Sequence, residues 1–278
     1  MRLSTIAGVA GQAGFVLPAT VSYLVIGGGG GGGNDFTNNF SASGGGSSGG
    51  YRSSWNGETS GGGCAAESAV VPALATAYTV TVGAGGAGDA NGSSSVFASI
   101  TSVGGGKGYG TQSSPCCPEP VRGGGPGGGA RGWYDTTVKG AAVSCQKRGG
   151  GNGYSAANYG GGGGGGAAGD GGNATASTGG AGGTGRASTI TGSSVTRASG
   201  GRGGTISGSV VANGAANTGD GGGGDQITAS ARSGGSGVVV LRFEGSTPTI
   251  SAGLTYSETT SGTDTILTFT AGTGTVVW

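Results

Sequence analysis

Glycine occupies 76 of the 278 positions and is concentrated in uninterrupted tracts. Residues 27–33 and residues 160–166 are each seven consecutive glycines. Each glycine loses more backbone entropy on folding than any other residue. A fold that accepts this loss must use what only glycine provides, namely φ of either sign and backbones in direct contact. The tracts therefore indicate stacked, extended glycine segments that form a durable scaffold presenting loops.

Two arrangements would use such tracts. In polyglycine II, helices with three residues per turn hydrogen-bond sideways to their neighbours, so every backbone N–H and C=O is paired. The interior of such a bundle excludes side chains larger than alanine, in keeping with the alanines within residues 83–88 and 160–169. We favour this bundle; the alternative is that the tracts are wide loops joining the strands of a β-sandwich. Collagen is excluded, because the chain has no strict Gly-X-Y repeat and only 7 prolines.

Short apolar runs adjoin the tracts and predict β-strands. The expected strands are residues 21–26, 77–82, 95–103 and 238–243. Segments rich in threonine and aromatic residues predict a small C-terminal β-hairpin, residues 254–259 with 266–270, and a third strand at 275–278. Glycine-free stretches long enough for a helix are nearly absent. The predicted fold class is all-β or irregular, with short strands flanking a polyglycine II bundle and essentially no α-helix.

The same pattern predicts three parts along the chain. Residues 1–20 form an N-terminal leader or attachment segment of small residues. Residues 21–245 form the glycine-rich domain, in which the bundle presents loops. Residues 246–278 form the C-terminal β-hairpin segment.

Composition excludes several classes of function. Charged residues make up 9% of the chain and the formal net charge is +1, so no basic stripe points to nucleic acid. No run approaches the ~18 apolar residues of a membrane-spanning helix, so we expect no membrane insertion. Disordered chains usually carry high net charge, which this chain lacks, so we expect an ordered protein.

The residues needed for catalysis are missing or scattered. The chain has no histidine, which excludes Ser-His and Cys-His nucleophilic sites. Carboxylates on glycine-flanked turns are too dispersed for a glycosidase pair or for the six to eight oxygens of a calcium site; examples are Asp89, Asp170, Asp220 and Asp225. The glycines of residues 104–108 lack the Ser or Thr of a phosphate-binding loop. We therefore expect no enzymatic activity, no cofactor and no metal site.

The four cysteines are Cys64, Cys116, Cys117 and Cys145. They lack paired C-x-x-C spacing, which argues against zinc. A bridge from Cys116 or Cys117 to Cys145 or Cys64 would staple a loop in an oxidising setting. Free, buried thiols are the alternative.

Aromatic residues in the irregular segments are the one indication of a binding site. Tyrosine among serine, glycine and asparagine is typical of adaptable binding loops, and tyrosine and tryptophan anchor interfaces. Each could instead cover the edge of the glycine bundle. The candidate receptor-binding residues are Tyr51, Trp55, Tyr109, Trp133, Tyr134, Tyr154 and Tyr159.

Five motifs, in order along the chain, resemble the glycine-rich domain of bacteriophage tail fibres. They are YLVIGGGG at residues 23–30, YTVTVGAGGAG at 78–88, STITGSSVT at 188–196, AANTG at 215–219 and GGSGVVVLRF at 234–243. The plan is also similar to that of the T-even-type tail-fibre tip adhesins, in which polyglycine II helices form a sandwich with variable loops at its distal end. By that analogy the variable segments are residues 34–60, 110–148, 153–159 and 213–232.

The resemblance implies a virion protein, located on the tail fibre and extracellular after release. Its partners would be a host cell-surface receptor, either an outer-membrane protein or a glycan, and other fibre or tail proteins. Homotrimers and monomers both occur among such proteins. A purely structural fibre or decoration subunit is the alternative, and a glycine-rich antifreeze or cell-wall protein is a third hypothesis. An antifreeze bundle would need a strict three-residue repeat, which the chain lacks.

Overall fold

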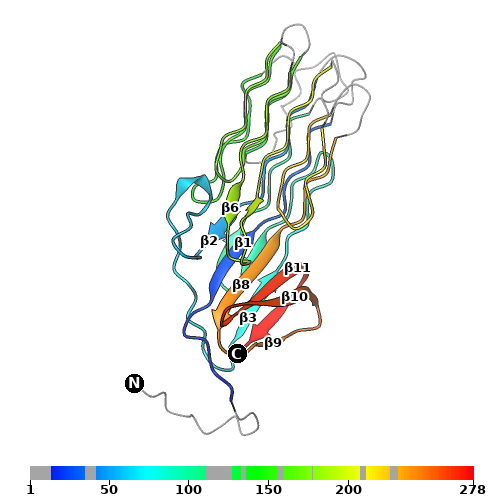
Figure 1. Ribbon diagram of the computed structural model, residues 1–278. Helices are drawn as coiled ribbons and strands as arrows, with labels where there is room; N and C mark the ends of the chain where they lie inside the picture. The colour runs from blue at the N-terminus through cyan, green and yellow to red at the C-terminus, as the bar shows by residue number, and fades with distance from the viewer. Residues whose placement is uncertain are drawn as a thin grey trace.

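The computed structural model describes residues 14–34, 42–110, 127–132, 136–155, 159–176, 178–206, 211–225 and 231–278. These residues form a β-sheet region at one end and a long bundle of extended tracts at the other (Figure 1). One 3₁₀ turn, η1 (Gly61–Gly63), is present, and the described residues contain no α-helix. The predicted fold class is confirmed.

Nine strands form one antiparallel sheet. Its main path is β2-β1-β8-β11-β3-β4-β5, and β9 and β10 also pair with β11. Its two end strands approach each other, because Arg52 of β2 donates to the carbonyl of Thr101 in β5. A separate two-stranded sheet contains β6 and β7. The strands are β1 (Ser22–Ile26), β2 (Tyr51–Ser53), β3 (Ala77–Thr81), β4 (Ser95–Phe97), β5 (Ile100–Ser102), β6 (Arg186–Ser188), β7 (Val195–Arg197), β8 (Val238–Glu244), β9 (Thr249–Ile250), β10 (Leu254–Ser261) and β11 (Asp264–Val277).

Strand β11 joins the two halves of the large sheet. Its first half pairs with β8 and β10, and its second half pairs with β3 and β9. Gly272 lies between the halves with φ +96°, a conformation that favours glycine. The predicted hairpin is present, but residues 275–277 continue β11 rather than forming a third strand. The predicted strand at 95–103 is likewise divided into β4 and β5, because Ala98 turns the chain with φ +52°.

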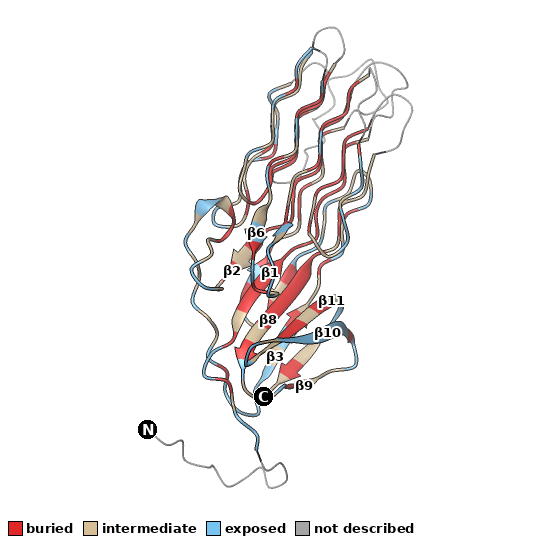
Figure 2. Ribbon diagram, in the orientation of Figure 1, coloured by how far each residue is buried: buried red, intermediate tan, exposed pale blue. Residues whose placement is uncertain are grey.

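Alternating side chains of β1 and β8 build two apolar clusters on opposite faces of the sheet. One includes Tyr23, Leu241 and Trp278. The other includes Ile26 and Tyr51, with Ala167, Ile190 and Ala198 from outside the large sheet. Figure 2 shows the buried residues continuing from β1 and β8 into the tracts of the bundle. The core therefore fastens one end of the bundle to the sheet.

The tracts form a polyglycine II bundle, as residues 27–33 show. The amide of Gly30 donates to the carbonyl of Ser47 at 2.9 Å, and the amide of Gly33 donates to Gly44 at 2.9 Å. The two amides between them donate to other neighbours, Ala90 and Arg232. Each neighbour is thus met at every third residue, which is the repeat of polyglycine II and not the two-residue repeat of a strand.

Six tracts surround residues 27–33 in a hexagonal arrangement. The amides of residues 27–33 donate to residues 44–50, 90–93 and 232–235. The carbonyls of the same tract accept from residues 86–89, 105–108 and 222–225. No space remains for side chains, since a Cβ on Gly29 would lie 1.9 Å from the carbonyl oxygen of Asp220. The run of seven glycines is therefore a packing requirement.

Three tracts are buried over their whole length, namely residues 27–33, 42–50 and 160–167. The two seven-glycine runs provide two of these interior tracts. The third contains Ser47, whose hydroxyl accepts from the amide of Gly106 at 2.7 Å. Residues 43–50 were expected to belong to a variable segment, but their exclusively small side chains place them inside the bundle.

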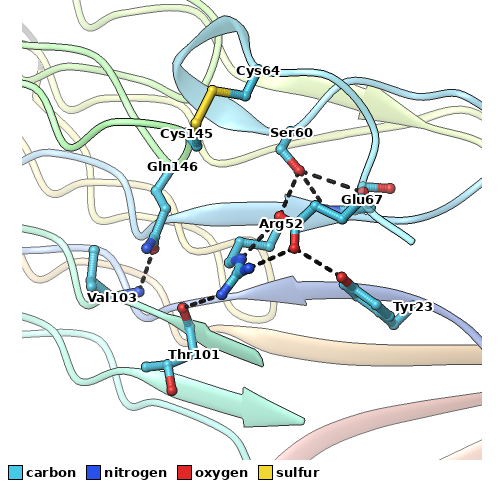
Figure 3. Close-up of polar contacts among 10 residues, drawn as sticks. Tyr23, Arg52, Ser60, Cys64, Glu67, Thr101, Val103, Cys145 and Gln146 are labelled. Atoms are coloured by element: carbon cyan, nitrogen blue, oxygen red, sulfur yellow. Dashed lines mark hydrogen bonds and ion pairs between the residues drawn. A yellow bond between two sulfur atoms is a disulfide. The ribbon is translucent and has the colours of Figure 1, made fainter. Parts of the chain in front are cut away.

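A network of charged and polar side chains fastens residues 54–70 across the sheet, near the base of the bundle (Figure 3). The two carboxylate oxygens of Glu67 accept from Arg52 at 2.6 and 2.9 Å, from the Tyr23 hydroxyl at 2.9 Å and from the Ser60 hydroxyl at 3.0 Å. Burial alone would raise the pKa of Glu67, but the hydrogen bonds from Arg52 and Tyr23 act in the opposite direction and the pKa is lowered. The ionised carboxylate is thus the form that holds this segment in place.

A disulfide between Cys64 and Cys145 links the same segment to the turn at residues 143–147 (Figure 3). The two cysteines are 81 residues apart in sequence, and their Cα atoms are 4.9 Å apart. The predicted pairing with Cys116 or Cys117 is wrong, because Cys64 and Cys145 bond to each other. Both turns lie at the base of the bundle, which brings these cysteines together; Cys116 and Cys117 lie outside the described residues.

Candidate receptor-contact end of the bundle

The tracts run between the sheet and a far end, where the chain reverses direction. Described turns at the far end include Ala87 to Ala90, where Asp89 has φ +61°, and Thr175 to Thr178. The described start of the chain and the C-terminus both lie at the opposite end, beside the sheet (Figure 1). The described turns at residues 87–90 and 175–178 therefore lie away from the described termini, whereas other turns, such as the one at residues 143–147, lie at the sheet end.

Of the five predicted aromatic residues that the structure describes, three lie toward this far end. Tyr109 is held between tracts, since its amide donates to Gly129 and its carbonyl accepts from Gly44. Tyr154 donates its amide to Gly160, and the carbonyl of Tyr159 accepts from Ala42. The side chains of Tyr154 and Tyr159 are partly exposed, whereas Tyr109 is 7% exposed. Tyr154 and Tyr159 remain candidates, and the burial of Tyr109 argues against a direct contact with a receptor.

Tyr51 and Trp55 lie at the other end, beside the sheet. Tyr51 is fully buried, because the alternation of β2 directs it into the core. Its pKa is raised to about 12 by burial. Trp55 donates its indole N–H to Thr189 at 3.1 Å, and the Arg242 guanidinium lies 4.3 Å from its ring centre. Tyr51 is therefore a core residue and Trp55 fastens a loop, so neither joins the far-end residues.

Trp133 and Tyr134 lie outside the described residues. The residue before them, Gly132, donates its amide to Ala42, whose own amide donates to the carbonyl of Tyr159. Trp133 and Tyr134 thus directly follow a residue of the far end.

Two far-end turns were not among the predicted variable segments. The Asp89 turn places its carboxylate 3.0 Å from the ammonium of Lys107, and the amide of Lys107 donates to the side chain of Asn91 at 2.9 Å. The second turn is closed by the amide of Thr175 donating to Thr178 at 2.9 Å. Their sequence signal was only a short polar stretch between two tracts, such as Asp-Ala-Asn after residues 83–88.

The far end thus offers polar turns, partly exposed tyrosines and an ion pair on a rigid support. Such groups suit recognition by stacking and hydrogen bonding. Among the described residues, no group of three or more Cys, Asp or Glu side chains is arranged to hold a metal ion.

Comparison with known families gives a match over most of the chain. A family model described as a glycine-rich domain covers residues 9–244. The chain belongs to this glycine-rich domain family. The match spans the bundle and most of the sheet strands, from β1 to the end of β8. A comparison of the glycine-rich domain with curated proteins gives no match. Within its described part, no helix is long and apolar enough to cross a membrane.

Proposed function

We propose that this glycine-rich domain protein is a phage tail-fibre or tail-fibre-tip adhesin that binds a bacterial surface receptor and catalyses no reaction. The observation that supports the proposal is that the described turns at residues 87–90 and 175–178, together with Tyr154 and Tyr159, lie at the far end of the bundle, opposite the sheet and the described termini. The sheet end would attach to other tail proteins, and the far end would contact the host.

The bundle suits this role because its interior cannot deform without breaking many hydrogen bonds. The amides and carbonyls of residues 28–33 all bond to surrounding tracts. Recognition loops can change in sequence on such a support, because loops tolerate variation better than the elements they connect. We thus propose that the bundle is a fixed scaffold and that the loops at its far end vary in sequence to recognise the receptor.

A purely structural virion subunit is the second candidate, and one observation favours it. Strand β10 is an eight-residue edge strand whose residues 255–260 are all exposed, including Tyr256 at 43%. Natural proteins often protect such edges with proline or charged side chains, and β10 contains no proline and a single charged residue, Glu258. Pairing of β10 with a neighbouring chain would make assembly the main role.

The test is binding of the purified, labelled protein to host cells in competition with whole phage. The adhesin proposal expects saturable binding that blocks phage adsorption. A Trp133→Ala, Tyr134→Ala, Tyr154→Ala variant should lose binding while remaining folded, and the sheet-end control Tyr256→Ala should retain it. A folded protein that binds no host cells would support the structural subunit instead. Protease treatment and periodate treatment of the cells would separate a protein receptor from a glycan.

A further inference from the structure

One tract of the bundle, residues 219–225, has neighbours in only five of its six lateral directions. The amides of residues 221–225 donate to residues 27–33, 198–204 and 211–214, as in the bonds of Gly222 to Gly30, Gly221 to Ser199 and Gly223 to Ala212. Its carbonyls accept from residues 43–49 and 231–236. The sixth direction lies between residues 198–204 and residues 211–214, and no described tract occupies it.

A groove of about 310 Å³ lies in this sixth direction. One wall is residues 199–202, the other wall is residues 212–215, and the floor is Asp220 and Gly221. The carboxylate of Asp220 accepts from the amide of Ser199 at 2.7 Å. A further tract in the sixth direction would supply acceptors for the amides along the groove. At the sheet end of the groove, the carboxylate of Asp220 supplies that acceptor instead.

The backbone groups that face the groove form a complementary set. In this packing each successive residue directs its amide and its carbonyl to a new neighbour, so groups three residues apart face the same way. The carbonyls of Gly221 and Gly224 face the sixth direction, and so do the amides of Arg202, Ala212 and Ala215. Within the described chain none of these five groups has a hydrogen-bond partner. Gly221 and Gly224 are buried residues, so their unpaired carbonyls are places where a donor would stabilise the protein.

We propose that this groove binds an extended glycine-rich segment of another chain, which completes the hexagonal packing around residues 219–225. A guest in the polyglycine II conformation would donate to Gly221 and Gly224 and accept from the walls, in step with the three-residue repeat. A guest of roughly six residues, at about 3.1 Å per residue, would span two such repeats. This docking site is separate from the far-end receptor contact and does not depend on it.

The chemistry of the groove favours this guest over a β-strand. A strand directs its backbone N–H groups toward one side at every second residue. These donors would not align with the carbonyls of Gly221 and Gly224, which are three residues apart. Glycine is needed on the sides facing the floor and walls, because a Cβ inside the lattice meets backbone oxygens, as at Gly221, where it would lie 2.0 Å from the Gly46 oxygen. Residues facing outward could carry side chains, including acidic ones near the exposed Arg202.

Proline offers a selective way to remove the wall donors. Ala212 and Ala215 are exposed, neither has positive φ, and neither amide is bonded to another described residue. Proline fixes φ near −65°, close to the polyglycine II value, and has no N–H. The variant Ala212→Pro, Ala215→Pro should therefore keep the fold but lose two donors, whereas Ala212→Ser, Ala215→Ser keeps both.

The experiment titrates the intact protein with acetylated (Gly-Gly-Ser)₃ amide while backbone amide NMR signals are recorded. We expect saturable shifts centred on Arg202, Ala212 and Ala215, unchanged affinity in the serine variant, and about tenfold weaker binding or more in the proline variant. A peptide with N-methylglycine in place of glycine should not bind. The proposal is overturned if no shifts occur up to about 10 mM peptide, if the shifts lie elsewhere, or if the folded proline variant binds equally well.

Discussion

The ammonium nitrogen of Lys147 lies 2.8 Å from the carbonyl oxygen of Gly104, inside the base of the bundle. Lys147 is fully buried, and its other neighbours are the Ser47 hydroxyl and the Ser48 carbonyl at 3.3 and 3.4 Å. Burial lowers the pKa of Lys147 to about 7. A cation held by neutral acceptors is therefore a feature of the junction between bundle and sheet.

This burial predicts a dependence of stability on pH. Between the folded pKa of about 7 and the ordinary value of 10.5, the unfolded chain binds more protons at this site than the folded chain. The free energy of unfolding should therefore rise as pH increases from about 7 to about 9, a window below the ordinary titration of tyrosine. Urea unfolding at several pH values measures this slope. The variant Lys147→Met should show a smaller slope, and an identical slope would contradict the assignment.

Interior and peripheral glycines should respond in opposite ways to alanine. A Cβ on Gly30 would lie 2.2 Å from the Gly106 oxygen, so Gly30→Ala should destabilise by about 3 kcal/mol or more. In Gly149→Ala the nearest atoms are 3.5 Å away and φ is not positive. This control should be neutral or stabilising by up to about 1 kcal/mol. Thermal unfolding of both variants provides the comparison, and equal losses would argue against direct backbone packing at Gly30.

The disulfide should contribute substantially to stability. Because Cys64 and Cys145 are 81 residues apart, the bridge restricts a long loop in the unfolded chain. The double variant Cys64→Ser, Cys145→Ser should lose about 2–4 kcal/mol in denaturant unfolding. Reduction of the unchanged protein should cause a similar loss but have no effect on the double variant. A reductant effect that persists in the variant would point to a different bridge.

The Glu67 network should weaken in acid. The lowered pKa of Glu67 means that its stabilising effect is complete above the ordinary glutamate pKa and is lost as pH falls through the folded value. Glu67→Gln should therefore cost roughly 1–3 kcal/mol at neutral pH, and less as the pH approaches the folded pKa. Tyr23→Phe, which removes only one donor to Glu67, should cost about 1 kcal/mol. A Glu67→Gln penalty that is the same at acid and neutral pH would be inconsistent with an ionised carboxylate.

Much of the fold could be predicted because its strongest signals are local. The apolar runs ending at Ile26 and beginning at Val238 form β1 and β8, and glycine tracts continue from them into the bundle. The division of residues 95–103 into two strands could not be predicted, because the turn at Ala98 contains neither glycine nor proline. The small side chains of residues 43–50 were a usable signal for a third interior tract.

The neighbours of each tract could not be predicted from sequence. A local sequence pattern cannot distinguish between tracts of similar composition. Contacts such as that of Gly29 with Gly235 join distant parts of the chain. The cysteine pairing and the position of Tyr51 depend on the same long-range order. The aromatic residues could therefore be identified as a class, but the sequence did not reveal that Tyr51 and Trp55 lie beside the sheet while Tyr154 and Tyr159 lie toward the far end.

The most direct test of the bundle is NMR detection of scalar couplings across its hydrogen bonds, from an amide nitrogen to the carbonyl carbon of its partner. The structure predicts couplings from Gly30 to Ser47 and from Gly33 to Gly44, with Gly31 coupled instead to Ala90. This three-residue alternation would establish polyglycine II packing around residues 27–33. Couplings to a single partner strand at every second residue, or none in a folded protein, would contradict it.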